Sequence, residues 1–167
     1  MTEKTQVLHS RSAYGTDKPH TSKQKDNITE KTQVLHSFSA YETREPHISN
    51  QKDNTYQYPC VYMCLKDGTI KCWWSNCNDK GFFGVPKVIW SNGVSSVHTD
   101  PTGQYGLTQF AFAIVDEPEN LENIKKAMEN KRFKKLMDHC SIRTAEKYNH
   151  QVISLFRKDF WKDFIND

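Results

Sequence analysis

The sequence predicts an α+β fold, in which a small mixed or antiparallel sheet is followed by C-terminal helices, with an extended or disordered N-terminal leader. Aromatic residues are concentrated after residue 55, where all four Trp and eight of the nine Phe lie. Apolar residues alternate or form short runs up to residue 115, and from residue 116 they recur at helical spacing. Strands first and helices last are typical of α+β domains.

The leader is a tandem duplication. Residues 2–27 and 29–54 align at a constant offset of 27 residues. Each copy has few apolar residues, so their burial would hardly offset the entropy lost on ordering the chain. We therefore expect residues 1–55 to be largely disordered, with the second copy docked in part through Phe38 and Tyr41. Residues 56–167 are expected to form the folded domain, because about 112 residues suffice for one small core.

The strands are predicted in the order of the chain. Residues 58–65 and 70–74 flank Asp67-Gly68, a strong signal for a hairpin with a two-residue turn. Residues 85–90 form a third strand, in which Pro86 fits only near the start or at an edge. Asn92-Gly93 marks another turn, from which residues 94–97 return. Residues 107–115 are apolar on both faces and predict one buried central strand.

Three helices are predicted after the strands. Acidic residues and Pro118 at 116–119 are typical of a helix start. Leu121, Ile124 and Met128 then recur at helical spacing, and the pattern breaks at Asn130, which is expected to cap a second helix. That helix carries an apolar stripe that includes Phe133 and Met137. A last continuous helix is expected over residues 149–165, with its aromatic residues on one face.

Composition restricts the function classes. The formal charge of +3 neither indicates nor excludes a nucleic-acid partner, so local clustering must decide. No apolar run approaches the roughly 18 residues of a membrane helix, and the first residues lack the apolar region of a secretory signal. Five cysteines at uneven spacing favour reduced thiols and an intracellular, cytoplasmic protein without a membrane partner.

The sequence shows no catalytic apparatus. Cys60, Cys64, Cys72 and Cys77 resemble a zinc site in spacing, but a two-residue turn would place Cys72 on the face opposite Cys60 and Cys64. We therefore interpret them as small buried residues and predict no metal and no cofactor. The acids at 116–119 are interpreted as helix-start residues rather than as nuclease carboxylates. Glycine-rich phosphate loops and a Pro-Pro methyltransferase motif are missing from the sequence.

Positive charge beside amides and aromatics is the remaining signal. Lys and Arg neutralise phosphates, whereas Asn, Gln and Ser on loops can read base edges. The predicted phosphate contacts are Lys80, Lys87, Lys131, Arg132 and Lys135. The predicted base contacts are Ser75, Asn76, Asn78 and Gln109. The hypothesis requires these groups to form one contiguous footprint on double-stranded DNA.

Several segments resemble the C-terminal target-recognition region of adenine-specific DNA methyltransferases of type II restriction–modification systems, found in bacteria and large DNA viruses. The segments that carry the resemblance are Trp74-Ser75, residues 80–89 (KGFFGVPKVI), residues 104–110 (QYGLTQF), residues 123–133 ending in Asn-Lys-Arg-Phe, residues 156–161 (FRKDFW), and in part residues 11–20 of the leader. The resemblance implies a non-catalytic module that recognises a short DNA sequence for a separate methyltransferase subunit. The pattern of that family usually has His where Phe82 stands here.

Two alternatives stay open at this point. One is a metal-dependent restriction endonuclease whose catalytic acids the sequence does not place. The other is a protein-interaction domain that uses the aromatic residues near Trp73 and Phe82.

Overall fold

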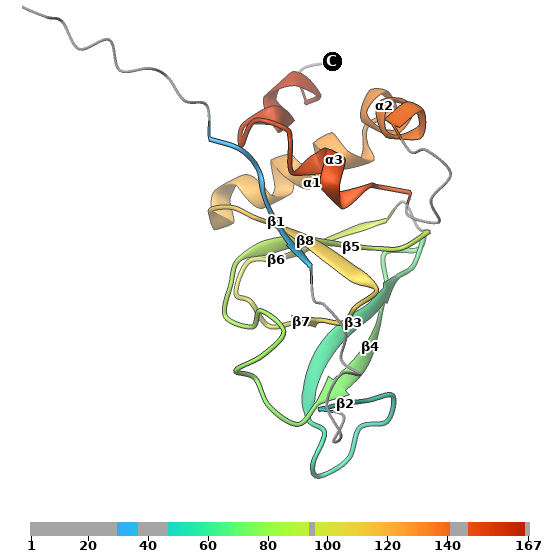
Figure 1. The fold of residues 1–167 in the computed structure, drawn as a ribbon, viewed down its shortest axis with the longest axis vertical. Helices are drawn as coiled ribbons and strands as arrows, with labels where there is room; N and C mark the ends of the chain where they lie inside the picture. Colours follow the sequence, from blue (N-terminus) through green and yellow to red (C-terminus); the bar gives the residue numbers. More distant parts are fainter. Residues whose placement is uncertain (1–29, 37–46, 94–95, 141–146, 166–167) are drawn as a thin grey trace, which may run out of the picture.

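A computed structural model describes residues 30–36, 47–93, 96–140 and 147–165 of the chain, and Figure 1 shows their arrangement. Two small and mostly antiparallel sheets are followed by C-terminal helices, which confirms the predicted α+β class. The strands are β1 (Gln33–His36), β2 (Ile48–Ser49), β3 (Tyr58–Cys64), β4 (Ile70–Ser75), β5 (Lys87–Ser91), β6 (Val97–Asp100), β7 (Gly106–Leu107) and β8 (Ala111–Val115). The helices are η1 (Pro118–Asn120), α1 (Leu121–Glu129), α2 (Lys131–Cys140), α3 (His150–Ile153) and η2 (Phe160–Asp163).

The molecule has three layers. The helix-side sheet has the strand order β1-β8-β5-β6, and the outer sheet has the order β2-β4-β3-β7. One hydrophobic core lies between the helix-side sheet and the helices, and a smaller one lies between the two sheets. In Figure 1 the helices occupy one end of the molecule and β2 lies at the other.

Strand β5 shows why both faces of the helix-side sheet are apolar. Its Val88 and Trp90 belong to the helix-side core, whereas Ile89 between them belongs to the core between the sheets. Side chains of a strand alternate between its faces, so a strand covered on both sides is apolar throughout. The indole N–H of Trp90 donates to the carbonyl of Tyr148 at 3.1 Å, which satisfies its polar atom within the core.

The second copy of the duplication contributes to both sheets. Strand β1 pairs with β8 and strand β2 pairs with β4, so residues 30–36 and 47–55, which the sequence analysis placed in the leader, are part of the fold. Few apolar residues suffice there, because Val34 packs against the helix-side core and Leu35 against the other one. Phe38 and Tyr41, the predicted docking residues, lie outside the described residues.

The hairpin of β3 and β4 is confirmed, but its turn is longer than predicted. Leu65 N–H donates to Thr69 O at 2.8 Å, so three residues, 66–68, form the loop. Gly68 has a φ of +85°, the conformation that such loops require at their last position. A bulge between Val61 and Met63 shifts the register again. Because Val61 faces Cys72 and Cys64 faces Ile70, Cys64 lies on the same face as Cys72, contrary to the predicted arrangement.

Residues 107–115 do not form one strand. The chain leaves the outer sheet after Leu107 and enters the helix-side sheet at Ala111. Thr108 forms the corner: its N–H and its hydroxyl both donate to Val61 O, at 3.2 and 2.8 Å, and its carbonyl accepts from Ala111 N–H. Apolar periodicity cannot show such a corner, because the residues on either side of it are equally buried. Strand β6 likewise begins at Val97, where the predicted strand ends.

The helices agree with the prediction except for the last. Helix α1 ends at Glu129, and Asn130 Oδ1 accepts from Arg132 N–H at 2.7 Å, so Asn130 caps α2 as predicted. The expected helix over residues 149–165 is wrong: α3 has four residues, and η2 follows after a break. Aromatic rings explain the pattern, because Phe156, Phe160 and Phe164 all pack around Phe133 although no continuous helix joins them.

None of the helices in the described part of the chain has the length and apolar character needed to cross a membrane.

Candidate nucleic-acid interface

Helix α2 carries four positive charges in its first five residues, at Lys131, Arg132, Lys134 and Lys135. Phe133 and Met137 are fully buried and hold the helix against the core. The opposite face is exposed and carries Lys131, Arg132 and Lys135. Three predicted phosphate contacts therefore lie together on one face of one helix.

The position of these cations in the helix is electrostatically unfavourable. The first turn of α2 contains no acid, although the helix dipole makes that turn partly positive and favours acids there. Lys131 and Lys135 are also four positions apart in the sequence, a spacing at which like charges on a helix repel. Within the described residues neither ammonium has an ion-pair partner. Lysines at positions where they destabilise their own helix are better explained by binding to an anionic partner than by a contribution to helix stability.

Arg132 differs from the two lysines because it also contacts the core. Its guanidinium lies 5.8 Å from the centre of the Phe164 ring. Such a contact orients the side chain on the aromatic ring.

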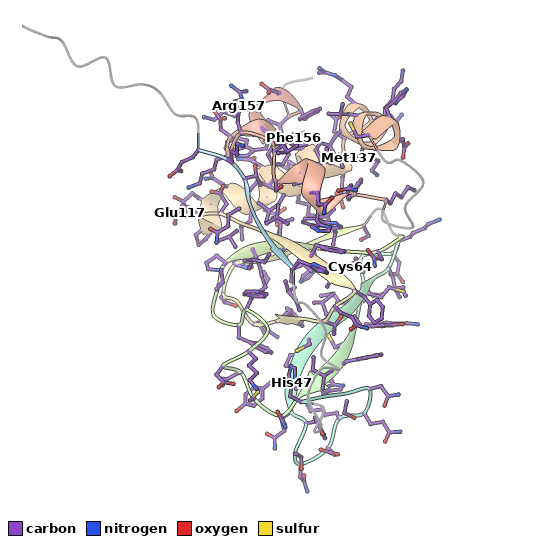
Figure 2. The ribbon with its side chains drawn as sticks, viewed as in Figure 1. His47, Cys64, Glu117, Met137, Phe156 and Arg157 are labelled. Carbon is purple, nitrogen blue, oxygen red and sulfur yellow. The ribbon has the colours of Figure 1, made fainter. Side chains whose placement is uncertain are left out.

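The other predicted loop residues lie elsewhere. Lys80, Asn76 and Asn78 are exposed in the connection between β4 and β5. Asn76 N–H donates to His47 O at 3.0 Å, and burial together with the charge of Lys80 lowers the pKa of His47. Figure 2 shows His47 at one end of the molecule and Met137 of α2 at the other. The prediction of a single contiguous footprint is therefore wrong: the cations divide between two ends of the fold.

Lys87 is buried and serves the structure. It is 0% exposed, and its ammonium donates to Phe82 O and Val85 O, both at 3.1 Å, and to Asp100 Oδ2 at 2.9 Å. All three of its hydrogen atoms are thereby used. Burial lowers the pKa of Lys87, while the Asp100 carboxylate acts in the opposite direction. This corrects its predicted role, because the ammonium is not exposed to any phosphate.

Asp100 extends this arrangement to a second loop. Its carboxylate accepts the N–H groups of Gln104 and Tyr105 at 2.8 and 3.0 Å. The ion pair thus fixes the loop before β5 and the loop after β6 to each other. Lys87 holds the 81–84 segment through the carbonyl of Phe82, a residue with an unusual φ of +65° that is 37% exposed.

Two residues predicted to contact bases, Ser75 and Gln109, are not exposed beside the cations. Ser75 is 1% exposed, and its hydroxyl accepts from Cys77 N–H at 3.2 Å within its own turn. Gln109 is half-buried at the corner before β8, where its carbonyl lies 3.4 Å from His36 Nε2. Burial of Ser75 corrects its predicted role. Gln109 lies in neither the α2 face nor the loop around Lys80.

Sequence reasoning missed a polar cavity of about 600 Å³ at the start of β1. It is lined by Glu30, Asp116, Asn120, Lys158, Asp159, Trp161 and Lys162. Ion pairs neutralise much of its charge: Lys158 lies 3.4 Å from Glu30 and Lys162 lies 3.5 Å from Asp159. No sequence signal identifies this cavity, because its acids and lysines come from three distant segments, one of them the duplicated leader.

The acids after β8 have local structural roles. Asp116 Oδ1 accepts from Glu117 N–H and from the Asn120 side chain, both at 2.8 Å, so it organises the start of η1. In the described part of the chain, no group of three or more His, Cys, Asp or Glu side chains is placed to hold a metal ion.

The cysteines are all free thiols. Cys60 and Cys64 are buried, at 1% and 0% exposure, as predicted for small core residues. Burial raises the pKa of each thiol to about 12, so both are protonated at neutral pH and poor nucleophiles.

Three aromatic rings pack together where the outer sheet meets the corner before β8. Tyr62 and Trp73 stack with ring centres 4.7 Å apart, and Phe110 meets both rings edge-on. The three rings mainly close this side of the sheet on the corner before β8.

No protein family, no curated protein and no solved structure matches this chain.

Proposed function

We propose that the protein is a non-catalytic DNA-binding module and that the exposed face of α2 contacts the phosphates of a duplex. The observation that carries the proposal is the group Lys131, Arg132 and Lys135, which is exposed on one face in the half of the helix where its own dipole disfavours cations. Phosphate contacts supply most of the sequence-independent affinity of such modules.

The dimensions of α2 suit this role. A helix of 10 residues is about 15 Å long, and the major groove of B-DNA, about 12 Å wide, accepts a helix. DNA-reading helices commonly present their N-terminal residues to the groove. In Figure 1 α2 lies at the outer end of the helical layer, away from both sheets.

The test is the salt dependence of duplex binding. Fluorescence anisotropy with a labelled duplex is measured between 50 and 200 mM salt, where each phosphate contact contributes about −0.9 to the slope of log K against log salt. The variant K131Q/K135Q is expected to make the slope less negative by about 1.8 and to weaken binding to all sequences alike. The matched control K52Q/K80Q removes the same charge away from α2: the ammonium of Lys52 lies 4.6 Å from the centre of the Trp74 ring on β4, and Lys80 lies near His47.

The two variants separate the possible outcomes. Loss confined to K131Q/K135Q supports the α2 face. Loss confined to K52Q/K80Q places the contact in the loop around Lys80, and a salt-independent response in the unchanged protein contradicts DNA binding altogether.

The resemblance to methyltransferase target-recognition regions extends this proposal to sequence specificity. A recognition module of this kind would direct a separate methyltransferase subunit to its site, and only that subunit would hold the catalytic groups. Repeated selection of bound duplexes from a random pool tests this part. An enriched short motif supports it, whereas enrichment of none, with binding retained, leaves a sequence-independent module.

A protein-interaction function is the second candidate, and Phe82 favours it. A bulky residue with φ of +65° is strained, and such strain concentrates at functional positions. Tyr58, 39% exposed, is a second large aromatic residue in this region, its ring centre 6.2 Å from that of Phe83. Concentration-dependent association that F82A abolishes, without any DNA binding, would favour this function.

The endonuclease alternative has a direct test. Magnesium-dependent nicking of plasmid by the purified protein, suppressed by EDTA, would favour it over both other functions.

A further inference from the structure

The two copies of the duplication differ in a way that the structure explains. Residues 2–10 and 29–37 are identical at all nine positions, and the six differences between the copies all lie after residue 10. The second copy of the identical segment contains β1 and the residues that lead into it. The first copy therefore carries an unaltered duplicate of this strand.

The site that holds β1 contacts most residues of this identical segment. On one edge, β1 pairs with β8 over Gln33–Val115 to His36–Phe112. Near its start it also contacts the C-terminal segment: Thr32 N–H donates to Phe156 O at 2.9 Å, and Lys158 N–H donates to Glu30 O at 2.7 Å. The strand thus lies in a slot with hydrogen-bonding groups on both sides.

Side chains add specificity to the slot. Thr32 Oγ1 donates to Arg157 O at 3.0 Å, and the carboxylate of Glu30 lies 3.4 Å from the Lys158 ammonium. Val34 and Leu35 pack against the two cores, and the His36 ring stacks on Phe112 at 4.5 Å. Each of these groups has an identical counterpart 27 positions earlier, at Glu3, Thr5, Val7, Leu8 and His9.

We propose that the slot beside β8 is a strand-binding site with a second occupant, residues 3–9 of the same chain. Strand addition of this kind takes its affinity from main-chain hydrogen bonds and its specificity from alternate side chains, and both are the same for the two copies. The chain therefore has two folded registers that differ only in which copy occupies the slot.

Loop length sets the balance between the registers. About 11 residues connect β1 to β2 in the observed register, and about 38 would connect residue 9 to β2 in the other. Because the closure entropy rises as 1.5 times the logarithm of loop length, the shorter connection is favoured about sixfold. The second register is then a minor but substantial fraction of the folded protein.

Substitutions in the two copies test the proposal in the full chain. V34D places a charge in a core contact of β1, and V7D places the same charge at the equivalent position of the first copy. V34D is expected to lower the folding equilibrium constant only about sevenfold, because the first copy replaces the damaged strand. V7D alone is expected to change it less than twofold, and V7D/V34D to lower it at least a further tenfold beyond V34D.

This non-additivity is the distinguishing result, because Val7 has no role if only the second copy occupies the slot. The control is V88D, in a core strand without a duplicate, whose effect is expected to be the same with and without V7D. If V34D destabilises as much as the double variant, or if both fail to fold, the proposal is wrong.

Cross-linking identifies the occupant directly. Lys31 lies next to Arg157 in the observed register, so a short amine cross-linker is expected to join Lys158 to Lys31 in the unchanged protein and to Lys4 in V34D. Trypsin does not cleave after a cross-linked lysine, so a link at Lys4 leaves the peptide 1–11 and a link at Lys31 leaves the peptide 26–44, which differ in mass. A Lys4 link that V7D removes, in a monomer, supports the proposal. A link found only between isotope-labelled and unlabelled chains shows exchange between molecules and overturns the intramolecular register.

Discussion

The variant K87M tests whether Lys87 stabilises the fold rather than contacting a phosphate, as the sequence predicted. If Lys87 is a structural residue, K87M should lower stability, whereas a phosphate contact would lower only DNA affinity. The substitution keeps most of the side-chain volume, so the expected loss comes from the ammonium rather than from packing.

The magnitude follows from the partners of that ammonium. Its removal leaves the buried Asp100 carboxylate without its counter-charge and two carbonyl groups, of Phe82 and Val85, without a donor. Removing one partner of a buried ion pair typically costs about 3–5 kcal/mol. That is a large part of the about 5–15 kcal/mol by which domains are stable.

Urea denaturation followed by tryptophan fluorescence measures the loss. With a slope of about 1.5 kcal/mol per M, the midpoint should fall by about 2–3 M. K80M removes an exposed ammonium and should change stability by less than about 0.5 kcal/mol. In the cycle of K87M, D100A and the double variant, the double should cost about 2 kcal/mol less than the sum, because each single variant leaves the other group unpaired. A loss below 1 kcal/mol in K87M would refute the reasoning.

Three further predictions rest on separate contacts. G103A should cost at least about 2 kcal/mol more than G84A, because both glycines have φ above +70° but a Cβ at Gly103 would collide with the backbone of Gly84 and Val85, whereas a Cβ at Gly84 meets open space. Chemical denaturation of the matched pair measures the difference. The free energy of unfolding should fall above pH 9, by about 1.4 kcal/mol at pH 10 for each of Cys60 and Cys64. The reason is that unfolded cysteines ionise near pH 9, whereas burial raises the pKa of both thiols to about 12 in the folded state. Urea midpoints at pH 8 and 10 measure this fall, and C64A should remove half of the contribution of these two thiols. Y148F should cost about 1–3 kcal/mol, because the buried carbonyl of Met128 loses the hydroxyl that donates to it at 2.9 Å; thermal unfolding measures it, and an unchanged melting temperature would contradict it.

Sequence patterns predicted those parts of the fold that depend only on residues close together in the chain. The break at Asn130 is an example, because a residue that caps a helix does so with its own side chain and the next two residues. The hairpin at Asp67-Gly68 is another, although the length of its loop was wrong. The aromatic residues of the C-terminal segment were expected on one face of a helix, but they gather around a common partner, Phe133, without a continuous helix.

The candidate site shows the limits of the same reasoning. Lys131 and Lys135 could be placed on one face because helical spacing is local. Lys87 could not be distinguished from them, since its counter-charge, Asp100, lies on the neighbouring strand and the sequence does not show which strands pair. That Lys80 lies near His47, at the opposite end of the molecule from Met137 of α2, was equally invisible in the sequence.

The sequence by itself determined that strands precede helices, the cap residue Asn130, the glycine turns, the free thiols and the identity of the two strand copies. Only the tertiary structure decided which cations are exposed, that the second copy belongs to the sheets, and that residues 107–115 turn a corner. The reason is physical: periodicity and capping act within a few residues, whereas burial and strand pairing depend on segments that meet only after the chain has folded.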